Sequence, residues 1–429
     1  MKHRTYRILA AVTLILIGSK TIQAQQNPEK EIRTNTTSAL SLNSYEAFKK
    51  SIKPLISEMS GKRIVALGEG THGTSEFYKV RYWITRLLVE EKGFNHVAFE
   101  NDFSDGWFLN KALDTTTNLR ALMQKHLLSI WQNEETRELL EWVRKYNNTH
   151  SKKITIDGLD YVFLSPDVNL LRELLKNNTA PSLSNVLNKL EAAANFQDGE
   201  WHGMNIKGFK SKWNELLASS KNGYSMADSL EKNINSLKLP SENKSAAMLA
   251  ILNLKQGFAP FHPKASQASR DSIMAENAGL ILQEPGSKMI IWAHEAHLAK
   301  TAIYNNAVGG TGGYLLRQFP GNYFVLGTGT ATGTFAATTE PRDTYTNPMA
   351  SYSLKIPFKD SWEELLNTVP KPAFYFYPKT LNPFRAVKQM RFIGYGPEIG
   401  SKVYDKTNIS DLFDAFIFIK ETRAATPLK

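Results

Sequence analysis

Short apolar runs alternate along the chain with longer segments in which apolar residues recur every three or four positions. The runs predict buried strands and the recurrences predict amphipathic helices. Strands are predicted at 63–67, 94–100, 153–160, 288–292, 322–327, 373–377 and 414–420. Helices are predicted at 40–59, 74–91, 134–146 and 264–282, with further helical patterns up to 128. This alternation predicts an α/β fold with a largely parallel or mixed central sheet flanked by helices.

Between residues 165 and 263 the pattern changes, because almost every segment is helical and no strand stands out. We interpret residues 165–263 as an all-helical insertion, or cap, that covers the carboxyl ends of the strands. Caps of this kind often complete a substrate pocket. The α/β catalytic core is then predicted to comprise residues 39–164 and 264–429, preceded by a flexible lead-in at 25–38.

The first 24 residues have the pattern of a secretory signal peptide. Basic residues precede the apolar run Ile8–Ile17, and a small residue, Ala24, ends the segment. Ten apolar residues are too few to span a bilayer. We therefore expect cleavage after Ala24 and a periplasmic or secreted protein without stable membrane association. An uncleaved anchor is the alternative.

The composition leaves the predicted fold unchanged but excludes several kinds of chemistry and partner. The 429 residues are 42% hydrophobic and include no cysteine, so disulfides and a thiol nucleophile are excluded. The formal net charge is +11, but the basic residues form no dense runs with interleaved aromatic residues. We therefore expect no nucleic-acid partner. We expect a monomer that acts on a small molecule.

Ionisable side chains follow several of the predicted strands. The first strand runs into a turn punctuated by glycines, which carries Glu69 and His72. The second strand ends on Glu100, and a later strand runs directly into His294 and His297. Because the carboxyl ends of parallel strands meet at one edge of a sheet, we expect these five side chains to lie close together.

This set of residues favours a site that activates water. A histidine near its ordinary pKa is well suited to act as a base at neutral pH, and a neighbouring carboxylate fixes its tautomer. Arg81 and Arg270 both share the apolar stripe of a predicted helix, so each needs a carboxylate partner or a ligand. The alternative for Arg81 is that its charged end reaches past the edge of the stripe into solvent. Either arginine, or a second histidine, would then steady a developing oxyanion.

Other chemistry remains open from the residues alone. The same side chains would suit zinc, although the His-Glu-x-x-His motif is absent. Gly68–Gly73 also matches the dinucleotide fingerprint, but Glu69 would place a negative charge against the pyrophosphate. No G-x-S-x-G motif supports a serine hydrolase. The Gly- and Thr-rich stretch 327–334 is expected to be an active-site loop or a plain turn, and a scaffold without catalysis is a further alternative.

A series of short motifs spans residues 45–422 in a characteristic order. The motifs are GEGTHGT at 68–74, VAFE at 97–100, Trp131, WVRKYN at 142–147, GLD at 158–160, RD at 270–271, MAEN at 274–277, WAHEAH at 292–297 and FDAFI at 413–417. As an ordered set they resemble the erythromycin esterase family. The resemblance implies an α/β fold with a helical region over the sheet. It also implies hydrolysis of the macrolactone ester of 14-membered macrolides such as erythromycin, and hence macrolide resistance.

The resemblance also implies roles for the residues already singled out. It assigns four to catalysis, with the first as general base and the second as its partner: His72, Glu69, Glu100 and His294. It assigns three to substrate binding or to the oxyanion: Arg81, Arg270 and His297. No metal or other cofactor is expected. Glu295 departs from the family pattern, which often has Asn between the two histidines.

Two alternatives to this function stay open. One is a metal-dependent hydrolase of another ester or amide that uses the same residues. The other is a non-catalytic periplasmic protein that binds a small molecule.

Overall fold

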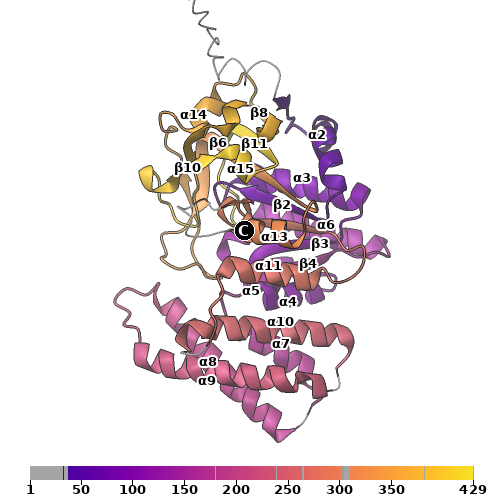
Figure 1. The fold of residues 1–429 in the computed structure, drawn as a ribbon, viewed down its shortest axis with the longest axis vertical. Helices are drawn as coiled ribbons and strands as arrows, with labels where there is room; N and C mark the ends of the chain where they lie inside the picture. Colours follow the sequence, from indigo (N-terminus) through magenta and orange to yellow (C-terminus); the bar gives the residue numbers. More distant parts are fainter. Residues whose placement is uncertain are drawn as a thin grey trace, which may run out of the picture.

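The structure, a computed structural model, describes residues 32, 37–178, 180–237, 239–262, 265–301, 303, 310–380 and 382–428. The predicted signal peptide, with its cut after Ala24, and most of the lead-in lie outside the described residues. Within the described part, the core is a mixed sheet of nine strands (Figure 1). These are β1 (Ser38–Ala39), β2 (Ile64–Glu69), β3 (His96–Asp102), β4 (Thr155–Asp160), β5 (Met289–His294), β6 (Tyr323–Ala337), β7 (Ala350–Ser353), β8 (Ala373–Phe376) and β11 (Ala415–Thr422).

The order of the strands creates a crevice at one edge of the sheet. Six neighbouring strands run parallel in the order β4-β3-β5-β2-β6-β11. β8 and β1 extend the sheet in antiparallel pairs, and β7 pairs antiparallel with the end of β6. The chain reaches β5 between β3 and β2, and then crosses to β6 on the far side of β2. In parallel sheets ligands bind outside the carboxyl ends of the strands at such a switch point.

Helices cover both faces of this sheet and so bury its central strands on both sides, as is usual for parallel sheets. Alternate residues of a strand point to opposite faces, so Val65 and Leu67 pack with one group of helices and Ile64 and Ala66 with another. The first group includes α2 (Tyr45–Ser60), α3 (Ser75–Lys92), α5 (Leu119–His126) and α6 (Glu134–Thr149). The second includes α11 (Arg270–Ile281), α13 (Thr311–Gln318), α14 (Trp362–Asn367) and α15 (Ile409–Leu412). The expected α/β class with a mixed, helix-flanked sheet is confirmed.

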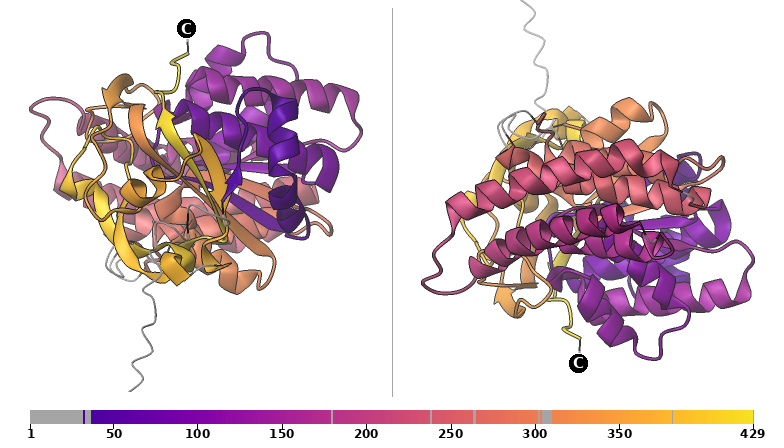
Figure 2. Two further views of the ribbon diagram at one scale, coloured as in Figure 1. Left: turned by 90° about the horizontal axis from the view of Figure 1, so that it is seen from above. Right: turned by 90° about the horizontal axis from the view of Figure 1, so that it is seen from below.

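A helical segment lies at one end of the molecule (Figure 1). It consists of α7 (Ser165–Leu175), α8 (Pro181–Gly203), α9 (Trp213–Asn233) and α10 (Ser241–Phe258). These helices share a hydrophobic cluster of their own and run side by side across the lower end of the molecule (Figure 2). The segment meets the rest of the chain at α4 (Phe103–Leu113) and α11.

The Gly- and Thr-rich stretch 327–334 is strand, and our expectation of a loop or turn was wrong. It forms the middle of β6 and pairs in register with β11 from Leu326 to Gly333. The ring of Phe416 lies where side chains at Gly327 and Gly329 would be. Pairing with a buried neighbour therefore outweighs the low strand propensity of glycine.

Two helices begin later than the apolar pattern predicted. The helix expected at 40–59 begins at Tyr45, because the Ser44 side chain accepts a hydrogen bond from Ala47 N–H at 3.2 Å. The helix expected at 264–282 begins at Arg270, where the Ser269 side chain caps it. A short hairpin of β9 (Val387–Arg391) and β10 (Tyr404–Asn408) was not predicted.

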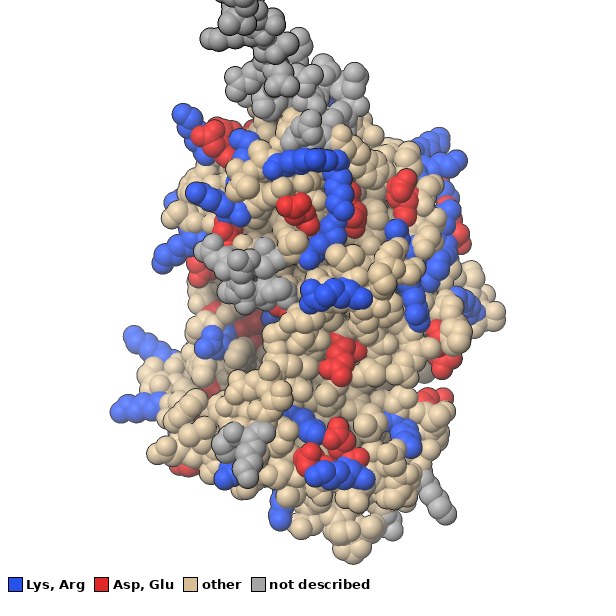
Figure 3. All heavy atoms as spheres, viewed as in Figure 1, with Lys and Arg blue, Asp and Glu red and all other residues tan. Residues whose placement is uncertain are grey.

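The surface gives no sign of a uniform basic patch on the face drawn in Figure 3, where basic and acidic side chains are interspersed. Within the described ranges, no helix combines the length and the hydropathy needed to span a bilayer. The expectations of no nucleic-acid partner, no stable membrane association and a monomer stay predictions.

Candidate active site

The candidate site lies at the carboxyl ends of β2, β3, β4 and β5. Glu69 ends β2 directly beside His294, which ends β5. Glu100 lies in β3, whose register with β4 shifts between Phe99 and Asp102. Such an irregularity re-aims side chains, and here one Glu100 oxygen, Oε2, accepts a hydrogen bond from His294 N–H at 2.9 Å.

The glycines of the turn after β2 allow the backbone to pass close to its neighbours. Gly73 has a φ of 69°, and an added Cβ would overlap the carbonyl oxygen of Ala336. A Cβ at Gly68 would lie 2.7 Å from Cγ of Glu295. The turn therefore serves tight packing and the placement of His72.

His72 and Glu69 form a buried pair at this turn. His72 Nδ1 lies 2.7 Å from Glu69 Oε1, and both residues are at most 4% exposed. A carboxylate can only accept, so Nδ1 carries the proton and Nε2 of the neutral ring is unprotonated. Nε2 of His72 has no hydrogen-bond partner among the described residues, and His72 lines a mostly apolar cavity. Burial lowers the pKa of His72, but the charge and hydrogen bond of Glu69 outweigh it and raise the pKa above 6.5.

Arg81 supports this pair from behind. Its Nη2 donates to Glu69 Oε2 at 2.9 Å, and its side chain is fully buried. The guanidinium lies over three aromatic rings, 4.6 Å from the ring centroid of Tyr78, 5.5 Å from that of Trp131 and 4.7 Å from that of Trp292. The expected contact between Arg81 and substrate does not fit this burial, because Arg81 does not line the cavity. The structure places it as the partner of Glu69.

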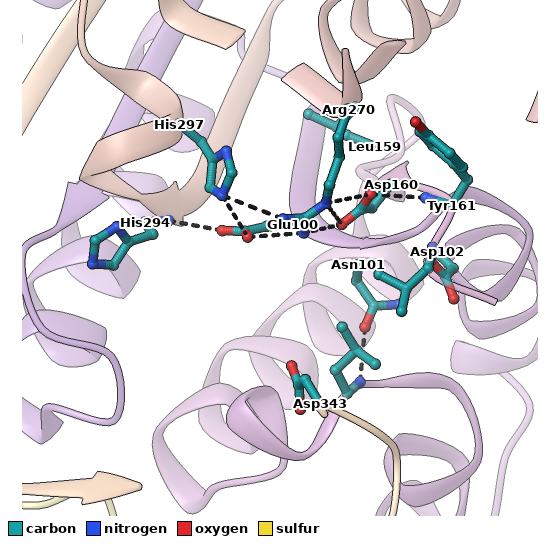
Figure 4. A network of polar contacts seen from close by, with 12 residues as sticks. Glu100, Asn101, Asp102, Leu159, Asp160, Tyr161, Arg270, His294, His297 and Asp343 are labelled. Atoms are coloured by element: carbon teal, nitrogen blue, oxygen red, sulfur yellow. Dashed lines mark hydrogen bonds and ion pairs between the residues drawn. The ribbon is translucent and has the colours of Figure 1, made fainter. Parts of the chain in front are cut away.

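A second cluster is centred on Glu100 (Figure 4). Glu100 Oε1 lies 3.1 Å from Arg270 Nη2 and 3.2 Å from His297 Nε2. Arg270 Nε also donates to both oxygens of Asp160 at 3.0 Å, and His297 Nδ1 lies 2.7 Å from Asp271 Oδ1. Burial raises the pKa of Glu100, but His297 and Arg270 outweigh it and hold the pKa well below its usual range. Glu100 is thus a carboxylate held by two cations.

The imidazolium form of His297 is expected to persist to alkaline pH. Burial lowers its pKa, but Glu100 and Asp271 outweigh this and raise the pKa from 6.5 to about 10. A raised folded-state pKa stabilises the fold fully below pH 6.5, and this contribution declines as pH rises and is lost at about 10. Thermal unfolding of wild type and His297→Gln should therefore differ most at low pH and converge near pH 10.

The matched control is His150→Gln, because His150 is exposed and contacts no carboxylate among the described residues. A nuclear magnetic resonance titration of the His297 ring provides a direct measurement. A midpoint near 6.5 would show that the two carboxylates do not hold its proton.

His294 has no free ring nitrogen. The backbone N–H of Ala296 donates to Nδ1 at 3.2 Å, so Nε2 carries the proton and donates to the carbonyl of Ile393 at 3.1 Å. Burial and the charge of His72 lower the pKa of His294 well below its usual range. Our expectation that His294 acts in catalysis does not fit these bonds. Its ring instead packs against that of His72, with the centroids 4.8 Å apart.

Glu295, the departure from the family pattern, lies away from the cavity. It is fully buried between β2 and β6, and one of its oxygens accepts a hydrogen bond from Thr328 N–H. Burial raises the pKa of Glu295 well above its usual range. The residue therefore does not change the charge of the cavity wall.

A cavity of about 500 Å³ connects the sheet edge with the helical segment. From the sheet side it is lined by His72, Glu100, Asp160 and Arg270. Its other walls are largely apolar and come from the helical segment and nearby loops: Leu128, Ile130, Val162, Trp201, Trp213, Leu216 and Phe261. A concave apolar site with a few convergent polar groups is typical of small-molecule binding.

Three acidic residues that contact or face the candidate catalytic side chains were not predicted as site residues from the sequence. Asp160 ends a predicted strand, and that position was the signal that could have identified it. Asp271 follows Arg270 at the start of α11, where nothing in the pattern linked it to a histidine. Asp343 lies in an irregular loop and had no sequence signal at all.

A metal does not fit the side chains as they are arranged. Both ring nitrogens of His294 and of His297 contact protein groups, and so does Nδ1 of His72. The guanidinium of Arg270 already pairs with both Glu100 and Asp160. Within the described ranges, no group of three or more His, Asp or Glu side chains is placed to hold a metal ion.

Known proteins resemble this chain in sequence and in fold. A family model described as erythromycin esterase matches residues 89–422. Erythromycin esterase type II of Escherichia coli is 34% identical over 110 residues, which cover 25% of this chain and 26% of that protein. The chain's match thus spans about a quarter of the length of this curated relative.

Two solved structures share the fold. A crystal structure of a succinoglycan biosynthesis protein has a TM-score of 0.75 at 21% identity, and the match covers 94% of this chain and 99% of the other. A mutant of the erythromycin esterase EreC in its open conformation has a TM-score of 0.66 at 18% identity, covering 90% and 98%. At this identity the structures show the fold alone. The family model, which matches most of the sequence, shows that the chain belongs to the erythromycin esterase family.

Proposed function

We propose that the protein is a carboxylic ester hydrolase that opens the macrolactone of 14-membered macrolides with water activated by His72, and so gives macrolide resistance. The observation that carries this proposal is the open Nε2 of His72 in a cavity, with Nδ1 held by the buried Glu69. This is the arrangement of a base and the group that orients it. Family membership supports the reaction class.

In this mechanism a water molecule lies between His72 Nε2 and the ester carbonyl carbon. Nε2 takes one proton from the water as its oxygen attacks the carbonyl. Glu69 stabilises the imidazolium that forms, since it already accepts from Nδ1. No side chain becomes acylated, so the oxygen of the attacking water ends in the new carboxylic acid.

Arg270 is the group best placed for the oxyanion. It lines the cavity and its side chain is 41% exposed, whereas His297 does not line the cavity. Asp160 and Glu100 fix the guanidinium through Nε and Nη2, and Nη1 lies 3.4 Å from His297 Nε2. The second hydrogen of Nη1 has no partner among the described residues and is the one that a ligand could accept. A cation that is held before the reaction begins stabilises a developing negative charge at little reorganisation cost.

The charged residues that line the cavity favour the binding of a cationic macrolide, although the net charge of the whole chain is positive. The only Lys or Arg among the described lining residues is Arg270. The acidic lining residues are Glu100, Asp160, Asp198, Glu200 and Asp343. Glu100 and Asp160 pair with Arg270, so Asp198 and Glu200 are the acids left to attract a cationic substrate. The apolar ring of the substrate would meet the aromatic and aliphatic wall.

Incubation with erythromycin is expected to add the mass of one water to the drug, as seen by mass spectrometry. A single turnover in oxygen-18 water should place the label in the drug's new carboxyl group and none in the protein. Label that is held transiently by the protein would contradict direct attack by water. A panel of 14-, 15- and 16-membered macrolides would define the ring size.

The same assay separates the two alternatives. A binding protein would retain macrolide without changing its mass. A metal-dependent hydrolase would lose activity on exhaustive chelation and regain it on metal addition, whereas we expect unchanged activity after chelation. His150→Ala, which removes an exposed histidine, is the matched control and should behave as wild type in both the mass measurement and the chelation measurement.

A further inference from the structure

Asp343 lies on a loop between β6 and β7 that is held in place from two sides. The Trp201 side chain of α8 donates to the Asp343 carbonyl at 3.0 Å. Asn205 pairs with the backbone of the preceding residue, Arg342, at 2.9 Å and 3.0 Å. On the other side, Ser129 N–H donates to the carbonyl of Thr344 at 2.9 Å. The position of Asp343 is thus set by the helical segment and by the core together.

The carboxyl group of Asp343 faces the cavity without a partner for one oxygen. Asp343 lines the same cavity as His72, Glu100 and Arg270, and Figure 4 shows it across from the Glu100 cluster. Its Oδ1 is enclosed and has no hydrogen-bond partner among the described residues. A buried polar atom without a partner is rare, and at a cavity wall it indicates a group that a ligand completes.

The protonation of Asp343 is coupled to that of His72. Burial raises the pKa of Asp343 to about 7; the charge of His72 lowers it, that of Glu100 raises it and that of Arg270 lowers it. His72 must be neutral to act as a base, and in that form its lowering effect disappears. The base form of His72 and the acid form of Asp343 therefore favour each other.

We propose that Asp343 is a further catalytic residue, a general acid that protonates the leaving alcohol oxygen while His72 activates water. This proposal rests on the proposed function. In the first step the water oxygen forms a bond to the carbonyl carbon, and His72 Nε2 takes a proton. When the tetrahedral intermediate collapses, the bond between carbon and the alcohol oxygen breaks, and that oxygen takes the Asp343 proton. The imidazolium then returns its proton to Asp343 through water, so that ester and water give acid and alcohol.

The leaving group is what makes such an acid necessary. The alcohol of a lactone leaves as a strongly basic alkoxide, and protonation during bond cleavage accelerates such steps by about 10²–10⁴-fold. A nitrophenolate leaving group is stable as an anion and needs no proton. The role of Asp343 can therefore be read from the dependence on leaving group.

The test compares wild type with Asp343→Asn on erythromycin and on two esters of one acid, an alkyl ester and a 4-nitrophenyl ester. We expect kcat for erythromycin and the alkyl ester to fall by about 10²–10⁴-fold, with KM nearly unchanged. The 4-nitrophenyl ester should react at close to the wild-type rate. Asp343→Glu should restore part of the loss, because it returns a carboxyl group.

The pH profile on erythromycin gives a second readout. An acid works only below its pKa, so wild-type kcat should fall at alkaline pH, and Asp343→Asn should lack this fall. The control for charge is Asp114→Asn, which removes an exposed carboxylate directly after the end of α4 and should behave as wild type.

Equal losses on both esters, or an unchanged alkaline limb, would overturn the proposal. A rise in KM for erythromycin with unchanged kcat would also overturn it and would assign Asp343 to cation binding. A wild type that hydrolyses none of the three esters would overturn the proposed function itself. An active wild type with a fully active Asp343→Asn variant would overturn only the catalytic role of Asp343.

Discussion

Replacing His72 with alanine is expected to lower kcat for ester hydrolysis by at least about 10²–10⁴-fold, the usual contribution of a positioned base. His72 is the histidine of the candidate site with an open ring nitrogen at the cavity, since His294 and His297 have both nitrogens engaged among the described residues. Neither can take over its role. Single-turnover hydrolysis of erythromycin measures the effect.

The fold should survive this substitution. Glu69 keeps Arg81 as a partner at 2.9 Å, so no buried carboxylate is left without a cation. His72→Gln, which is closer in volume, should be equally inactive and lose less stability. The control is His150→Ala, which removes an exposed ring that stacks on Tyr146. Substantial turnover by a folded His72→Ala protein would exclude His72 as the base.

The pH dependence of the same assay tests the charge state of the base. Glu69 raises the pKa of His72 in spite of burial, and Glu100 adds to that effect. A base works above its pKa, so wild-type kcat/KM should fall as pH drops through this raised value. His72→Gln should lose this acid limb together with its activity.

The part of the site that sequence reasoning predicts best is the part that is local. Glu69 and His72 are three residues apart on one turn, so any fold that keeps the turn keeps the pair. Glu100 and His294 come together only through the strand order, which parallel strands with buried runs made predictable. Hence the residues were predictable, but their hydrogen bonds were not.

The ring orientation of His294 illustrates that limit. It depends on the first turn of α12 (Glu295–Leu298), whose N–H group binds Nδ1, and on the carbonyl of Ile393, which arrives from a distant loop. Neither contact leaves a periodic signal in the sequence. Arg81 was likewise ambiguous, since an arginine on an apolar stripe can face either a ligand or a buried carboxylate. Only the packing of three aromatic rings around it decides.

Tertiary pairing also explains the error in β6. A Gly/Thr run has the composition of a loop, and no local property contradicts that reading. The register with β11 and the ring of Phe416 over the glycines turn it into strand. Asp343 lies beyond the end of that strand in an irregular loop, so neither periodicity nor motif could place it at the cavity.

Replacing Arg81 with leucine is expected to destabilise the fold by about 3–5 kcal/mol, the usual cost of removing one partner of a buried ion pair. Glu69, which is 0% exposed, would keep only His72 as a hydrogen-bond partner. The contacts of the guanidinium with Tyr78, Trp131 and Trp292 would be lost as well. Urea unfolding at neutral pH measures the change in free energy.

Arg86→Leu is the matched control, because Arg86 lies on the same helix and pairs with Glu90 at 3.1 Å but remains partly exposed. An exposed pair is worth about 0–1 kcal/mol, so this variant should unfold almost as wild type does. If Arg81→Leu is no less stable than Arg86→Leu, Glu69 does not depend on Arg81 as a buried partner.

A double-mutant cycle with Glu69→Gln separates the charge pair from the packing of the guanidinium against the rings. Removing both charges leaves no unpaired carboxylate, so the double variant should be more stable than the sum of the single losses predicts. The part of the loss that remains reports the aromatic contacts, for which cation–π energies of about 2 kcal/mol apply at desolvated sites. Glu69→Gln should nevertheless lower kcat, since a neutral amide cannot stabilise the imidazolium of His72 as a carboxylate does. A stable but slow double variant would therefore show that Arg81 is needed because catalysis requires a buried carboxylate at position 69.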